Sequence, residues 1–164
     1  MWSLPPPPPA LTLARQLPPL SFQGFRAGMP VEQAGERIHT AGGSLGCKPT
    51  LDARMRDCTG AVRLPELPRA EVLVSSVHDS SAVIVLSFSG PTELAARWIS
   101  ELSERFGTPN QRGHAGRPRS WEWIRSGTML RVTERKFGGG WETSVTLTHG
   151  PLLDGLGPTQ PKPG

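Results

Sequence analysis

The sequence predicts an α+β fold, an antiparallel sheet with two helices on one face. Two segments, 30–41 and 91–106, repeat apolar residues at helical spacing. Runs of β-branched and apolar residues follow each segment, separated by glycine-rich or polar turns. Because the order of elements is the same after both helices, the sequence also suggests two tandem helix-plus-strands units that merge into one sheet.

Both predicted helices begin at a proline, Pro30 or Pro91. Proline is favoured there because an N–H in the first helical turn has no acceptor within the helix, so its absence costs no hydrogen bond. Both end at glycine, at Gly42 and Gly107, since glycine adopts the left-handed conformation that closes a helix. The apolar side of the first helix consists of Val31, Ala34, Ile38 and Ala41. That of the second consists of Leu94, Ala95, Trp98, Ile99, Leu102 and Phe106.

The clearest strands are "AEVLVSSV" (70–77) and "AVIVLSFS" (82–89), which the polar turn "HDSS" joins into a hairpin. A tight turn is predicted at Thr59-Gly60, and a polar, glycine-rich loop at 110–119. The remaining predicted strands are 45–48, 54–58, 62–64, 120–126, 128–134 and 141–149.

Proline and glycine set the predicted domain limits. The chain of 164 residues contains 18 Pro and 19 Gly, and many of them fall near the two ends. Such ends lack the periodic apolar surface that would offset the entropy of ordering them. We therefore expect a proline-rich disordered tail at 1–21, a single domain at 22–150 and a disordered tail at 151–164.

The start of the chain does not match a secretory signal, because prolines interrupt its apolar letters and no basic residue precedes them. No stretch reaches the roughly 18 apolar residues of a membrane span, so none is expected.

The only two cysteines, Cys47 and Cys58, lie close together in the sequence. On neighbouring strands they would form a disulfide, and closing a loop of about 12 residues would stabilise the fold by about 3 kcal/mol. A pair with no cysteine left over suits an oxidising compartment, the periplasm or the outside of the cell. The alternative is two buried, reduced thiols in a cytoplasmic domain.

Catalytic and metal chemistry find little support in the sequence. The histidines and cysteines do not have the spacing of a zinc site, and no nucleophile elbow or phosphate-binding loop is present. The neighbours His78, Asp79, Ser80 and Ser81 are explained by turn chemistry. We expect no enzyme activity, no metal and no cofactor.

A basic stretch runs from residue 105 to residue 136. It holds two acidic residues and eight basic ones: Arg105, Arg112, Arg117, Arg119, Arg125, Arg131, Arg135 and Lys136. Such a stretch is suited to an anionic partner, and Gly116-Arg117-Pro118 matches the centre of a minor-groove-binding hook. The alternative function is therefore a cytoplasmic nucleic-acid-associated protein that uses this stretch.

Alternation places Trp121 and Trp123 on one face of their strand, either in the core or on a recognition surface. We predict that a protein partner is bound through the open face of the sheet and the basic loop. The candidate binding residues are Arg112, Arg117, Arg119, Trp121 and Trp123.

Three short motifs resemble those of a known family. "GMPVEQ" resembles the glycine–methionine helix start of the small SmpA/OmlA (BamE-like) envelope lipoproteins, and "RFGTP" resembles the glycine–proline exit of their helix. "WEW" resembles their tryptophan-bearing first strand, and the tandem arrangement is similar to the β-lactamase inhibitor protein fold. The resemblance covers roughly residues 25–149 and implies a non-catalytic, protein-binding module of the bacterial cell envelope.

Overall fold

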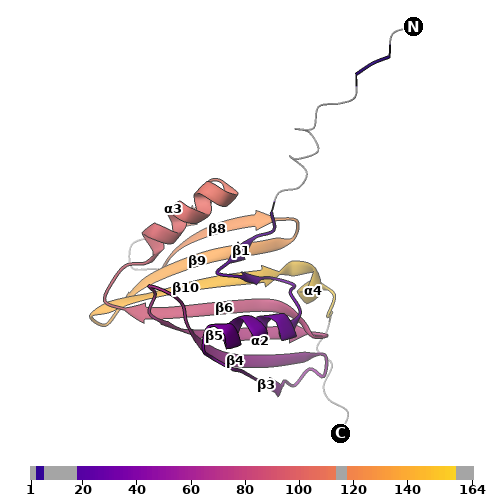
Figure 1. The fold of residues 1–164 in the computed structure, drawn as a ribbon, viewed down its shortest axis with the longest axis horizontal. Coiled ribbons are helices and arrows are strands. Elements are labelled where there is room, and N and C mark those ends of the chain that lie inside the picture. Colours follow the sequence, from indigo (N-terminus) through magenta and orange to yellow (C-terminus); the bar gives the residue numbers. More distant parts are fainter. Residues whose placement is uncertain (1–2, 6–17, 114–117, 158–164) are drawn as a thin grey trace.

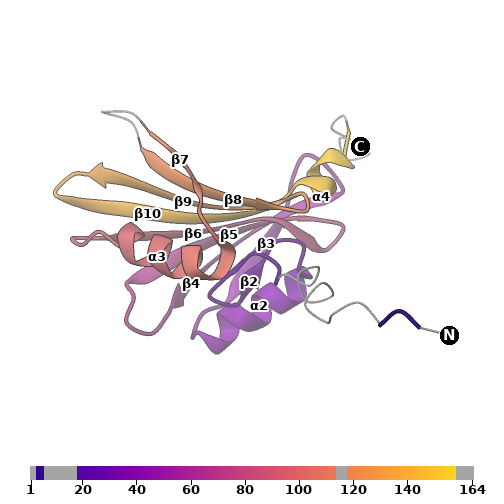
Figure 2. The same cartoon turned by 90° about the horizontal axis from the view of Figure 1, so that it is seen from above.

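The structure is a computed structural model that describes residues 3–5, 18–113 and 118–157. Its main feature is an eight-stranded antiparallel sheet with the strand order β3-β4-β5-β6-β10-β9-β8-β7. Figure 1 shows this sheet from β3 to β8, and Figure 2 labels β7. The strands of this sheet are β3 (Leu45–Pro49), β4 (Met55–Arg63), β5 (Arg69–Val77), β6 (Ser80–Gly90), β7 (Asn110–Arg112), β8 (Arg119–Arg125), β9 (Thr128–Phe137) and β10 (Gly140–His149).

Smaller elements complete the described part of the chain. β1 (Ser21–Phe22) and β2 (Phe25–Arg26) form a separate two-stranded sheet. The helices are α2 (Val31–Thr40), α3 (Ala95–Phe106) and the short α4 (Gly150–Asp154), which lies at one end of the long strands (Figure 2). Four strands of the large sheet follow α2 and four follow α3, and the two sets meet where β6 pairs with β10.

The predicted α+β class, with two helices on one face of the sheet, is wrong. The structure is mostly β, with 50% strand and 19% helix, and its helices are small. The prediction underestimated the strands: β4 runs without interruption through the turn expected at Thr59-Gly60. A Cβ on Gly60 would meet the carbonyl oxygen of Ser44 at 2.5 Å, so this glycine marks a close approach of two backbones inside the sheet.

One buried cluster holds the domain together. Alternate side chains of the strands, such as Val72, Ile84 and Val145, enter it together with Ile38 of α2 and Trp98 of α3. The Trp98 ring packs edge-on against Phe22 at 5.1 Å and Phe88 at 4.8 Å, measured between ring centroids. The core therefore links the N-terminal hairpin, α3 and the middle of the large sheet.

The domain limits stay a prediction, because much of the two predicted tails lies outside the described residues. Leu20, within the predicted N-terminal tail, is buried in the core cluster. The predicted C-terminal tail begins with the short helix α4, which His149 caps by accepting a hydrogen bond at Nδ1 from the Leu152 N–H at 3.2 Å. Composition did not reveal this turn of helix, because its capping contact comes from a histidine.

Two left-handed residues, Ser126 at φ 50° and Gly127 at φ 78°, join β8 to β9. This two-residue hairpin turn strongly prefers asparagine before glycine, because asparagine tolerates the left-handed region. We therefore expect Ser126→Asn to raise the free energy of unfolding by about 0.5 kcal/mol. Thermal unfolding measures the gain, and Ser89→Asn, at an exposed strand position, is the control that should show none. A loss of stability at position 126 would contradict the turn geometry.

Candidate functional site

The disulfide between Cys47 and Cys58 is confirmed. The two residues are directly opposite in the register of β3 and β4, with Cys58 fully buried and Cys47 exposed. The bond therefore fastens β3, which forms one edge of the sheet, to the core. Its role is structural, since both cysteines are consumed and the chain has no other.

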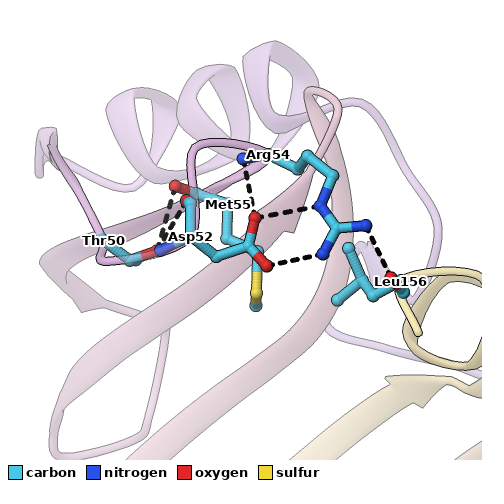
Figure 3. Close-up of polar contacts among 5 residues, drawn as sticks. All are labelled: Thr50, Asp52, Arg54, Met55 and Leu156. Carbon is cyan, nitrogen blue, oxygen red and sulfur yellow. Dashed lines mark hydrogen bonds and ion pairs between the residues drawn. The ribbon is translucent and has the colours of Figure 1, made fainter. Parts of the chain in front are cut away.

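The turn between β3 and β4 is held by a polar cluster, shown in Figure 3. The buried carboxylate of Asp52 accepts hydrogen bonds from the Arg54 backbone N–H at 2.9 Å, from Nε at 3.0 Å and from Nη2 at 2.7 Å. Arg54 Nη1 donates to the Leu156 carbonyl at 2.5 Å. Its hydrogen bond to Asp52 raises the pKa of Arg54 above its ordinary value. This cluster anchors the segment after α4 to the turn.

The structure places Trp121 and Trp123 in the core, where they lie opposite Val132 and Leu130 of β9. The indole N–H of Trp123 donates to the Gly107 carbonyl at 2.8 Å. The sequence left open whether the two tryptophans belong to the core or to a recognition surface. The structure shows that both belong to the core. Neither presents an exposed aromatic surface to a partner.

The predicted arginines fall in three different situations. Arg119 pairs with the buried carboxylate of Glu134 at 2.5 Å and with Glu93 at 3.2 Å, and these bonds raise its pKa. Arg112 is exposed on the edge strand β7. Arg117 lies outside the described residues. The five predicted binding residues thus do not form one site in the described part of the chain.

Much of the basic stretch is neutralised by pairing across strands. Arg131 lies 2.7 Å from Glu122, and Arg135 lies 3.1 Å from Glu142. The sequence alone does not reveal these partners of Glu122 and Glu142, because the partners of a strand residue depend on register. The surface of this half of the sheet is therefore less positive than its composition indicates.

The strands present a second side, which we call the open face, opposite the buried cluster. Along β5 and β6 the buried side chains alternate with partly exposed ones, among them Val83, Val85 and Ser87. Leu73 is 39% exposed on this face, and Val85, directly opposite it on β6, is partly exposed as well.

A groove of about 1060 Å³ lies on the open face over β4, β5 and β6. The connection between α2 and β3 forms its rim, where a Cβ on Gly43 would meet the Ala61 carbonyl oxygen at 1.9 Å. A smaller hollow of about 280 Å³ adjoins it at Ser89 and Glu142. The side chains in the groove that carry charge, polarity or exposed apolar surface are Ser44, Thr59, Arg63, Arg69, Glu71, Leu73, Val85 and Ser87.

The groove is lined by small, hydroxyl-bearing, aliphatic and charged residues. Its lining residues include no histidine, cysteine or aspartate. Within residues 3–5, 18–113 and 118–157, no group of three or more potential metal ligands comes together. No helix in the same ranges is long and apolar enough to cross a membrane.

Comparisons with family models, curated proteins and solved structures found no match to this chain. The resemblance to the SmpA/OmlA (BamE-like) lipoproteins and to the β-lactamase inhibitor protein fold therefore stays a prediction from short motifs. What the chain does must be inferred from the open face, the groove and the disulfide.

Proposed function

We propose that this chain is a non-catalytic, protein-binding module of an oxidising compartment, namely the bacterial cell envelope or its exterior. Its partner is bound on the open face, with the groove over β4–β6 at the centre of the contact. The observation that carries this proposal is the partly exposed Leu73 beside Val85 in a groove bordered by charged and hydroxyl side chains. An apolar centre with a polar rim is the usual composition of a protein interface.

The disulfide supports the choice of compartment. The reducing cytoplasm keeps most cysteine thiols reduced, whereas secreted and periplasmic proteins retain their disulfides. Here both cysteines are joined, and the bond fastens an edge strand of the same sheet that carries the groove. A module that works outside the cytoplasm gains from this covalent support.

Charge pairing favours a protein partner over nucleic acid. Nucleic-acid binding requires several cations free to contact phosphate groups. In the basic stretch, Arg119, Arg131 and Arg135 are paired with carboxylates. The side chains of Arg105 and Arg125 donate hydrogen bonds to Ser21 and to the Pro18 carbonyl. Three of the eight basic residues are thus neutralised by carboxylates in the described part of the chain, which lowers the positive charge that this stretch offers to a phosphate backbone.

Replacing the exposed leucine of the groove tests this proposal. The tagged chain is purified from the cells it comes from, after nuclease treatment, as the natural sequence and as Leu73→Gln. We expect one protein to copurify with the natural sequence, and its amount to fall about tenfold in the variant, because the apolar centre of an interface carries most of its binding energy. Leu51→Gln is the matched control, since Leu51 is 87% exposed in the β3–β4 turn, away from the groove.

Two outcomes would contradict the proposal. The first is equal recovery of the partner with Leu73→Gln and with the natural sequence. The second is copurification of nucleic acid in a parallel purification without nuclease, released steeply as the salt concentration rises, because phosphate contacts are lost with salt.

A further inference from the structure

Opposite charges face each other across the strands of the large sheet. Glu122 lies opposite Arg131, and Arg119 lies opposite Glu134. Glu142 lies opposite Arg135, and Lys48 lies opposite Asp57. Such directly opposed pairs stabilise a sheet, whereas like charges in the same position destabilise it. In these four pairs, the register of the strands places a positive residue directly opposite a negative one.

Arg63 and Arg69 depart from this pattern. They are directly opposite in the register of β4 and β5, and their neighbours Val62 and Ala70 are buried, so the two arginines point to the open face. Both side chains are exposed and line the groove. Directly opposed residues have Cβ atoms about 4.5–5.5 Å apart, so the two positive charges repel each other.

Neither guanidinium forms an ion pair within the described part of the chain. No ion pair or side-chain hydrogen bond between described residues involves Arg63 or Arg69. Glu71 is the acidic residue that lines the groove, and Glu142, which lines the adjoining hollow, is already paired with Arg135. The groove therefore holds more positive than negative charge.

We propose that Arg63 and Arg69 together bind a carboxylate group of the protein partner. This inference rests on the proposed function and specifies the chemistry of the partner: an acidic side chain next to an apolar one. Two guanidinium groups offer parallel N–H donors that match a carboxylate, and charge-assisted bonds of this kind are the strong ones. Leu73 and Val85 in the same groove receive the apolar neighbour.

The arginine pair also explains selectivity. Without a partner, Arg63 and Arg69 form no ion pair among the described residues, and an incoming carboxylate reduces the repulsion between them. Glu71 in the same groove repels a second acidic group placed beyond the arginines. The groove thus favours one acidic side chain flanked by apolar residues over a uniformly acidic segment.

Photochemical cross-linking in the cells of origin tests the inference. The photoreactive amino acid p-benzoylphenylalanine is placed at position 89, because Ser89 is exposed and lines the hollow that Arg69 also lines. We expect a protein adduct whose cross-linked segment contains Asp or Glu. In the double variant Arg63→Gln, Arg69→Gln the adduct should fall about tenfold. Arg26→Gln, at an exposed arginine of β2 outside the groove, is the matched control and should leave the yield unchanged.

The thermal midpoint of the double variant separates binding from folding. Because the two arginines repel each other, we expect the double variant to unfold at the same temperature as the natural sequence or higher. A lower midpoint would assign the arginines to folding and overturn the inference. An unchanged adduct in the double variant, or a cross-linked segment without an acidic residue, would overturn it while leaving the proposed function intact. Absence of a protein adduct with both arginines present would overturn both proposals.

Discussion

Replacing Trp98 with alanine is expected to lower the free energy of unfolding by about 3–5 kcal/mol. The Trp98 ring is fully buried and lies edge-on against Phe22 and Phe88, so its removal opens a cavity where three parts of the core meet. The N-terminal hairpin, α3 and β6 would lose their common contact. Chemical unfolding, followed by circular dichroism, measures the loss.

Trp98→Phe is the control for this prediction. Phenylalanine keeps most of the ring contacts and removes the indole N–H, which finds no hydrogen-bond partner among the described residues. An unsatisfied buried donor costs about 1–3 kcal/mol, so its removal offsets much of the lost packing. We expect Trp98→Phe to cost about 1 kcal/mol or less. Equal losses for the two variants would contradict the role assigned to the ring.

Loss of the disulfide is the second large effect. We expect Cys47→Ser to lower the free energy of unfolding by about 3 kcal/mol. The disulfide joins residues 11 apart in the sequence, and closing a loop of that length in the unfolded chain accounts for a loss of this size. For a chain of this size that corresponds to a fall of roughly 6–12 °C in the thermal midpoint. Cys47 is exposed in β3, so a serine in its place should create no packing defect.

Reductant provides the control for the disulfide. In its presence the natural sequence also loses the bond between Cys47 and Cys58, and the two proteins should unfold at the same temperature. A difference that persists in reductant would show that the cysteine stabilises the fold by packing rather than by the covalent link.

Local patterns predicted the long elements well. Both α2 and α3 lie within the segments of helical periodicity, and the hairpin of β5 and β6 lies on the two β-branched runs. The helix α3 begins only at Ala95, several residues after Pro91. These elements are set by residues close in sequence, where periodicity, proline and glycine act directly.

Elements that depend on distant contacts escaped prediction. β4 continues through Gly60 because the chain at Ser44 passes against it, and β7 pairs residues of a predicted loop with β8. The fold class was wrong for the same reason. Short polar strands such as β7 are stabilised by their neighbours in the sheet and carry little signal of their own.

The candidate site was predicted only in part. The disulfide and the basic residues could be found from residue type and spacing. The groove could not, because Arg63, Arg69 and Leu73 come together only through the register of β4 and β5. Register also decides which charges are paired: Arg119 meets Glu134, whereas Arg63 meets another arginine.

We propose that a disulfide-stabilised sheet binds a protein on its open face. Native mass spectrometry of the chain, taken from its own cells without reductant, tests this claim. We expect a complex with a second protein which, on denaturation, releases the chain about 2 Da lighter than its reduced form, since a disulfide lacks two hydrogens. The chain alone, with Cys47 and Cys58 as free thiols, would contradict the claim.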